Sequence, residues 1–207
     1  MLTLEPKAFA DYDKKEQEAI MIMARAKANM IKIHITDEEL QQIHDFAIAK
    51  AIAKYGESNH VNDDDDEYKR CFTGMLGEVA LEKLFGVKFA DWTIGHSSKY
   101  NFSDLFKIGY HIGIKTVELS KLPVVYKNSK DPELICVRRD THTVILCGLA
   151  LPDVLNNNLD INFVKSYKIR REGKKSAFTG FDKLIKITTL ADLDPYNKIN
   201  TYKKNRR

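Results

Sequence analysis

The sequence predicts one small α/β domain, and three features carry this prediction. Its 207 residues match the size of a single domain with its own apolar core. Apolar residues recur at helical spacing over residues 68–85, and the pattern stops at Gly86, a natural helix C-terminus. Segments rich in branched and aromatic residues then predict strands. These segments are 101–106, 110–117, 133–138 and 142–149, with further edge strands expected at 163–169 and 184–188.

Two helices are expected before this core. Residues 14–31 mix charged and apolar side chains at a spacing close to helical. Thr36 and Glu39 form a capping-box pattern at the start of a second helix that ends near Gly56. We therefore expect an N-terminal helical extension, residues 1–57, before an α/β core, residues 66–207, the two forming one compact domain.

Composition excludes a membrane-spanning role and favours an intracellular protein. Hydrophobic residues make up 43% of the chain, yet no apolar run approaches the roughly 20 residues that span a bilayer. Residues 1–12 lack the pattern of a secretory signal, so we expect a cytoplasmic location, or the host cytoplasm if the chain is phage-encoded. The three cysteines, Cys71, Cys136 and Cys147, lie in apolar stretches and are expected to be buried reduced thiols.

Basic residues cluster in one short stretch of this mildly basic chain, whose formal net charge is +4. Clustered cations bind nucleic-acid phosphates with a gain in free energy from counterion release. A solvated basic loop is the alternative. The candidate nucleic-acid-binding residues are Lys168, Arg170, Arg171, Lys174 and Lys175.

Two glycines stand inside the helix predicted at 68–85. Gly74 and Gly77 each cost about 1 kcal/mol in a helix interior. We therefore expect another backbone to approach this helix closely, beside the carboxylate of Glu78.

A lysine occupies the predicted strand at 110–117. Because side chains alternate along a strand, Lys115 shares one face with His111 and Gly113, while Ile112 and Ile114 point into the core. Lys115 is therefore expected to point away from the apolar layer, towards whatever Asp104 faces.

These residues resemble the PD-(D/E)XK nuclease superfamily, especially phage and bacterial members. Such proteins carry a G-x-x-G-E-x-A helix, then an Asp, then an I-x-V-K-T strand. The matching residues are Gly74, Gly77, Glu78 and Ala80, then Ser103 and Asp104, then Ile112, Gly113, Ile114, Lys115 and Thr116. The resemblance covers roughly residues 68 to 150 and implies a restriction-endonuclease-like fold, a mixed central sheet flanked by helices.

The resemblance also implies a chemistry. Asp104 and Glu78 would bind Mg²⁺ or Mn²⁺ together with the backbone carbonyl of Ile114, and the metal would activate water at a phosphate. Lys115 would orient that water or neutralise the transition-state charge. Lys115, Glu78 and Asp104 are thus the candidate catalytic residues.

One position departs from the family pattern. Members usually carry Asp or Glu two residues before the lysine, where this chain has Gly113. Glu82 lies one helical turn after Glu78, so it is a candidate replacement ligand, and His111 shares the face of Lys115. Glu118 has the wrong strand parity unless a bulge intervenes.

Three functions stay open at this point. The preferred one is metal-dependent hydrolysis of phosphodiester bonds in DNA, with RNA as an alternative substrate. The second is a catalytically inactive nucleic-acid-binding protein that keeps the nuclease fold. The third is a structural protein whose N-terminal helices mediate assembly, for example as a homo-oligomer. Taken singly, the site residues also suit ordinary roles, as solvated helix, turn and edge-strand positions.

Overall fold

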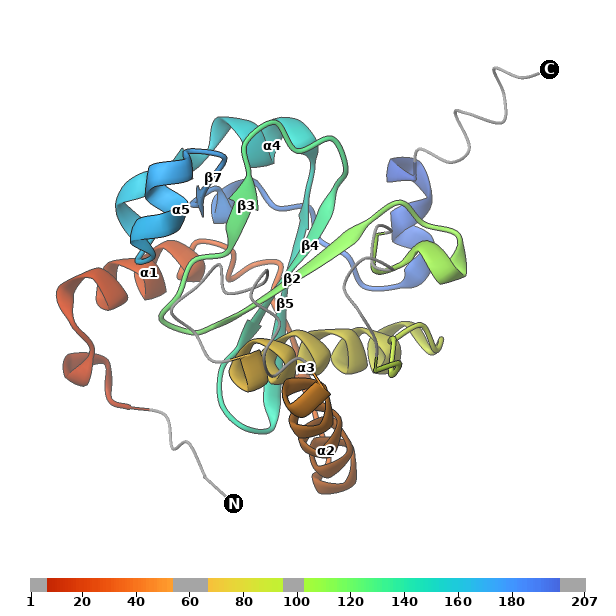
Figure 1. Ribbon diagram of the computed structural model, residues 1–207. Helices are drawn as coiled ribbons and strands as arrows, with labels where there is room; N and C mark the ends of the chain where they lie inside the picture. The colour runs from red at the N-terminus through yellow and green to blue at the C-terminus, as the bar shows by residue number, and fades with distance from the viewer. Residues whose placement is uncertain (1–6, 54–66, 95–102, 198–207) are drawn as a thin grey trace.

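The computed structural model describes residues 7–53, 67–94 and 103–197. Its centre is a four-stranded sheet with the order β1-β5-β4-β2 (Figure 1). The strands are β1 (Ile31–His34), β2 (Gly113–Glu118), β4 (Glu133–Arg138) and β5 (Thr143–Ala150). The β1–β5 and β4–β5 pairs are antiparallel and the β2–β4 pair is parallel, which confirms the α/β class and the mixed central sheet.

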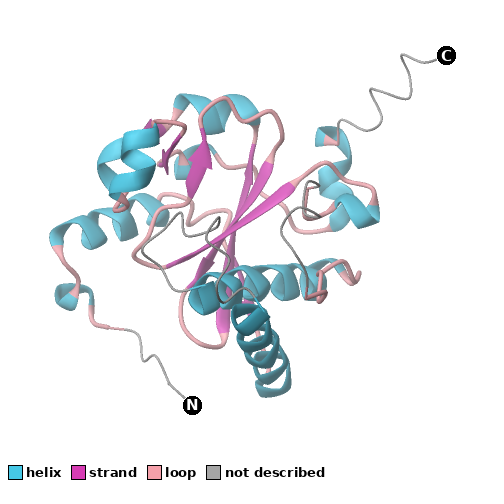
Figure 2. Ribbon diagram, in the orientation of Figure 1, coloured by secondary structure: helices cyan, strands magenta, loops and turns pink. Residues whose placement is uncertain are grey.

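Helices cover both faces of this sheet (Figure 2). One face packs against α2 (Asp37–Ala53) and α3 (Glu67–Phe85). The other face packs against α1 (Lys14–Ala24) and a small antiparallel sheet with the order β3-β7-β6. The elements on this second side also include β3 (Val124–Tyr126), β6 (Leu159–Asp160), β7 (Lys175–Phe178), α4 (Pro152–Asn157) and α5 (Tyr167–Glu172).

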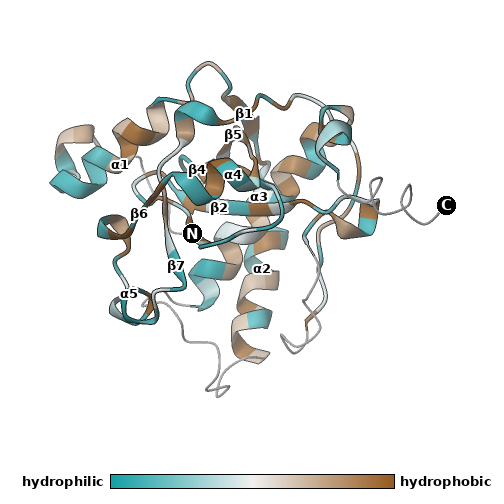
Figure 3. Ribbon diagram, turned by 90° about the horizontal axis from the view of Figure 1, so that it is seen from above, coloured by the Kyte–Doolittle hydropathy of each residue, from teal (hydrophilic) through white to brown (hydrophobic). Residues whose placement is uncertain are grey.

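Alternation along the central strands divides the core into two layers. In β4, Leu134 and Cys136 belong to the layer with α2 and α3, whereas Ile135 and Val137 belong to the layer with α1. Both faces of the strand are buried, which explains its nearly continuous apolar sequence. The surrounding helices instead carry both hydrophobic and hydrophilic residues along their length (Figure 3).

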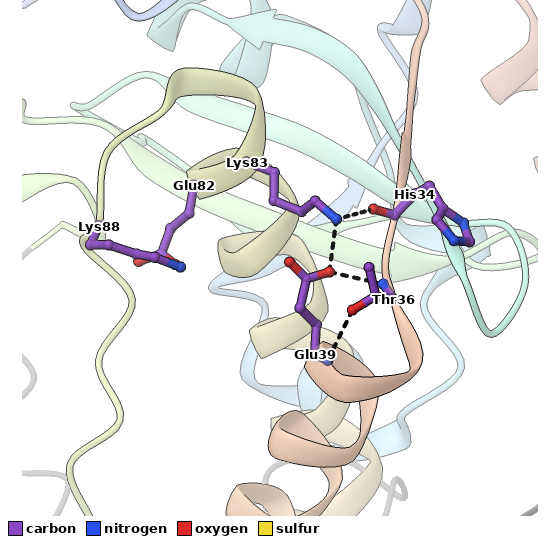
Figure 4. Close-up of polar contacts among 6 residues, drawn as sticks. All are labelled: His34, Thr36, Glu39, Glu82, Lys83 and Lys88. Carbon is purple, nitrogen blue, oxygen red and sulfur yellow. Dashed lines mark hydrogen bonds and ion pairs between the residues drawn. The ribbon is translucent and has the colours of Figure 1, made fainter.

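The capping box at the start of α2 is confirmed. The Thr36 N–H donates to Glu39 Oε2 at 2.8 Å, and the Glu39 N–H donates to Thr36 Oγ1 at 3.3 Å. Lys83 of α3 donates to the same Glu39 oxygen at 2.8 Å and to the His34 carbonyl at 2.7 Å (Figure 4). These contacts fix α3 against the corner between β1 and α2. The helix predicted at 68–85 is confirmed as α3.

One prediction for the N-terminal half is wrong. The first helix ends at Ala24 and does not reach residue 31, because Ile31–His34 forms β1 at the edge of the central sheet. Ile33 and Ile35 alternate into the core there, so burial of one strand face decides the conformation. The N-terminal extension therefore contributes a strand as well as helices.

The segment before β2 also differs from its prediction. Residues 101–102 lie outside the described part, and Ser103–Leu105 form a turn followed by the 3₁₀-helix η3 (Phe106–Ile108), where a strand was expected. Gly109 ends this helix with φ of 90°. The other 3₁₀-helices are η1 (Phe9–Asp11), η4 (Ile161–Phe163), η5 (Phe181–Lys183) and η6 (Leu190–Tyr196).

The expected edge strands near the C-terminus are wrong in type. Residues 163–169 instead end η4 and begin α5, whose N-cap Ser166 accepts a hydrogen bond from the Ile169 N–H. Residues 184–188 supply one bridge, Ile185 to Leu149, and no strand.

The cysteine prediction holds for two of three residues. Cys136 and Cys147 are buried free thiols, whereas Cys71 is half-buried. Within the described ranges, no helix combines the length and the apolar character needed to cross a lipid bilayer.

Candidate active site at the edge of the mixed sheet

Glu78 reaches the sheet because α3 lies very close to β2. A methyl group added at Gly77 would overlap with Thr116 Oγ1 and lie 2.9 Å from Thr116 Cβ. The close approach expected at Gly77 is therefore confirmed, although the contacting group is a side chain and not a backbone. At Gly74 the expectation is wrong, because an added methyl group would meet nothing within 4 Å.

Asp104 is held by a turn that folds back onto β2. The fully buried side chain of Leu105 anchors the turn, and the Leu105 N–H donates to the Ile112 carbonyl at 3.2 Å. Asp104 Oδ2 then accepts a 2.5 Å hydrogen bond from the Ile114 N–H. The Asp104 carboxylate is thereby fixed beside the first residues of β2.

Glu133 is the site residue that the sequence analysis missed. It begins β4, and its Cα is the register partner of the Gly113 Cα. A methyl group added at Gly113 would lie 3.6 Å from Glu133 Cγ and 3.7 Å from Asp104 Oδ2. The space into which a side chain at position 113 would point is thus bordered by two carboxylate side chains from other segments.

Lys115 lies on the same side of the sheet edge. Its Nζ is 4.0 Å from Glu133 Oε2, and its side chain is 40% exposed. Its positive charge lowers the pKa of both Asp104 and Glu133, against the dominant effect of desolvation. Lys115 is therefore close enough to both carboxylates for its charge to act on them.

Desolvation raises the pKa of all three carboxyl groups, and the charge of Asp104 raises those of Glu78 and Glu133 further. Desolvation, followed by the charge of Asp104, raises the pKa of Glu78 to about 7, although the Asp91 N–H donates to Glu78 Oε2 at 3.4 Å. Desolvation also raises the pKa of Glu133, with a further increase from Asp104. Desolvation by the surrounding chain raises the pKa of Asp104 although the residue is exposed, and the Ile114 N–H opposes the shift.

The negative charge of Asp104 acts on both Glu78 and Glu133. A bound cation would offset this repulsion. Glu133 Oε2 is buried and accepts no hydrogen bond from the described residues. Among those residues, however, no group of three or more His, Cys, Asp or Glu side chains is gathered tightly enough to hold a metal ion as it stands. Oxygen ligands of this type suit Mg²⁺ or Mn²⁺, and ligation would require side-chain rotation, above all of Asp104 away from the Ile114 N–H.

The Glu82 carboxylate is engaged elsewhere. Its side chain is buried, its Oε1 accepts hydrogen bonds from the Phe89 and Ala90 N–H groups at 2.6 and 2.8 Å, and its Oε2 lies 2.8 Å from Lys88 Nζ (Figure 4). The Glu82 carboxylate thus holds the segment that follows α3 against that helix. It does not bring Glu82 to the Asp104 group.

The other two replacements considered for Gly113 have partners of their own. The His111 ring packs edge-on against Phe106, with centroids 5.4 Å apart. Glu118, at the far end of β2, pairs with Lys69 and Lys121 at 3.5 and 3.3 Å. Glu133 is therefore the carboxylate that lies beside Gly113.

The predicted basic residues divide into two groups. Arg170 of α5 and Lys175 of β7 line the same cavity as Lys115. Among the described residues, Lys168, Arg171 and Lys174 are not part of that lining and lie exposed on the same short segment.

Comparisons with protein-family models, with curated proteins and with solved structures find no match. The side chains at the sheet edge, and the order in which they occur along the chain, are therefore the features that bear on function.

Proposed function

We propose that this protein is a metal-dependent nuclease with a restriction-endonuclease-like core, which hydrolyses phosphodiester bonds in DNA, with RNA as the alternative substrate. One observation carries the proposal. Glu78, Asp104, Lys115 and Glu133 come from a helix, a turn and two strands; Lys115 Nζ lies 4.0 Å from Glu133 Oε2, and the charge of Asp104 raises the pKa of both Glu78 and Glu133. The first three occur in the order of the family motif, and the fourth borders the position where that motif carries an acid.

The raised pKa values support a site that accommodates a cation. Uncompensated carboxylates in a poorly solvated site disfavour their own ionisation, whereas a divalent ion favours the ionised forms. Glu78, Asp104 and Glu133 would supply oxygen ligands, together with the Ile114 carbonyl. A bound Mg²⁺ or Mn²⁺ would stabilise negative charge on the phosphate and lower the pKa of the attacking water.

The remaining roles belong to the chain itself. Lys115, held near Glu133 and accessible from solvent, would neutralise charge on the phosphate oxygens in the transition state. The Glu78 carboxylate, which a bound cation would keep ionised, would accept a proton from the attacking water. A new P–O bond would form to the water oxygen, the ester P–O bond would break, and the leaving oxygen would take up a proton.

Cleavage of labelled DNA and RNA, with Mg²⁺ and then with EDTA, tests this function. We expect cleavage in Mg²⁺ and none in EDTA. The cleavage rate in Mg²⁺ should fall about 100-fold or more in the variants Lys115→Ala and Asp104→Ala. The matched control is Lys186→Ala, which removes an exposed lysine outside the cavity and should leave the rate unchanged. Circular dichroism and thermal melting establish that each variant is folded.

Two results would contradict the proposal. One is cleavage that persists in EDTA or in a folded Lys115→Ala variant. The other is salt-sensitive binding of nucleic acid with no cleavage under any divalent ion. The second result would favour the inactive nucleic-acid-binding protein, which Gly113 makes the main alternative.

A further inference from the structure

A cavity of about 830 Å³ opens beside Lys115. It is lined by residues of α1, α3, β2, the β2–β3 connection, α5 and β7. Lys115 and Thr116 belong to this lining, so the cavity begins at the candidate active site. We call it the basic cavity, because eight Lys or Arg residues and two Glu residues line it.

The two acidic residues in the lining are paired with lysines of the same lining. Glu118 lies 3.5 Å from Lys69 and 3.3 Å from Lys121, and Glu16 lies 3.3 Å from Lys165. Such pairs hold long side chains in place at the wall, while the lining keeps a surplus of six positive charges. A surplus of this size attracts a polyanion.

The cations of the basic cavity come from elements on both sides of the central sheet. Lys69 comes from α3 on one side, and Arg170 and Lys175 come from α5 and β7 on the other. A volume of about 830 Å³ lies within the range of enclosed ligand sites. It suits a few nucleotides of one strand, and not the cross-section of a duplex.

Two exposed tyrosines are not part of the cavity lining but lie next to two of its cations. Tyr167 is 70% exposed and lies one helical turn before Arg170 on α5. Tyr126 is 57% exposed, and Lys175 Nζ lies 4.5 Å from the centre of its ring. Proteins that bind single strands combine a basic groove with aromatic rings on which bases stack.

We propose that the basic cavity binds a single nucleic-acid strand, with phosphates at Arg170, Lys175 and Lys69 and with bases stacked on Tyr167 and Tyr126. One part of this proposal rests on the proposed nuclease function, namely that the bound strand places a phosphate at Lys115. Binding itself requires no metal and no cleavage.

The first test measures binding in EDTA by fluorescence anisotropy, with a labelled single-stranded oligonucleotide of about 12 nucleotides and a duplex of the same length. The variant Arg170→Gln/Lys175→Gln removes two cavity cations. The matched control, Lys27→Gln/Lys186→Gln, removes the same charge from exposed positions outside the lining. The substituted residues are exposed or partly exposed, so both double variants should fold.

The expected result is a change in salt dependence. Each phosphate contact to a single strand contributes about 0.7 to the slope of log K against log salt, so the cavity variant should lose about 1.4. This loss corresponds to about 25-fold weaker binding at about 0.1 M salt, if the salt-independent part of binding is unchanged. The control variant should stay within about twofold of the wild type.

Tyr167 gives a second, independent readout. Tyr167→Ala should weaken single-strand binding about fivefold or more, whereas Tyr167→Phe, which keeps the ring, should bind as the wild type does. Equal effects of the two double variants, tighter binding of the duplex, or equal binding by the two Tyr167 variants would each overturn the proposal. If strand binding follows these expectations while cleavage is absent, the nuclease proposal fails and the cavity assignment stands.

Discussion

Glu133 lies beside Gly113 in the parallel β2–β4 ladder, with its Cγ 3.6 Å from the point where a side chain at position 113 would begin. We infer that this carboxylate, carried by the neighbouring strand, takes over the position that the nuclease motif assigns to residue 113. The chain has no acid at position 113 but has one at its register partner on the neighbouring strand.

This relationship predicts that an acid at position 113 can partly replace Glu133. Glu133→Gln should weaken Mn²⁺ binding at least tenfold, as measured by calorimetry, and lower the cleavage rate with it. Gly113→Asp added to Glu133→Gln should recover part of both, because an added Cβ at position 113 makes only ordinary van der Waals contacts. Metal binding that is unchanged in Glu133→Gln would show that Glu133 has no such role.

The raised pKa of Glu78 predicts a loss of stability with rising pH. The group titrates near 4.5 in an unfolded chain and near 7 in the fold, so the folded state binds the proton more tightly. Its contribution is fully present below pH 4.5 and is lost as the pH rises to about 7, a loss on the order of 3 kcal/mol. Urea unfolding in EDTA, between about pH 5 and 8, measures the effect.

A variant and a metal separate Glu78 from other titrating groups. Glu78→Gln should flatten this pH dependence, because the amide does not ionise. Mg²⁺ at about pH 8 should restore stability to the wild type, and less to the variant, since a cation favours the ionised carboxylate. A steep pH profile in Glu78→Gln would assign the effect to another residue.

The contact of α3 with β2 predicts opposite effects for two glycines of one helix. Gly77→Ala should destabilise the fold by about 1–3 kcal/mol, because the methyl group overlaps the Thr116 side chain. Gly74→Ala should be neutral or stabilise by up to about 1 kcal/mol, since its methyl group meets nothing within 4 Å. Thr116→Ala should relieve part of the Gly77→Ala effect, and equal unfolding midpoints for the two glycine variants would refute the close contact.

The position of Glu82 predicts a structural role without a metal role. Glu82→Ala leaves the Phe89 and Ala90 N–H groups without their acceptor, which should cost about 2–3 kcal/mol. The thermal shift caused by Mg²⁺ should nevertheless match that of the wild type, in contrast to Glu78→Gln. If Mg²⁺ caused no thermal shift in a folded Glu82→Ala variant, Glu82 would be identified as a metal ligand.

The sequence alone determined the elements whose signals are local. Helical periodicity and a terminal glycine gave α3, the Thr36–Glu39 pattern gave the start of α2, and branched residues gave β4 with its observed limits. Strand alternation also placed Lys115 on its correct face. Each of these signals is set by backbone geometry over a few neighbouring residues, so it can be read without knowing the fold.

The tertiary structure decided which distant residues meet. Only the β2–β4 register brings Glu133 to Gly113, only the path after α3 assigns Glu82 to two backbone N–H groups, and only pairing with β5 makes Ile31–His34 a strand. Register and chain path follow from burying whole faces of several elements together, an energy that no short stretch of sequence carries by itself.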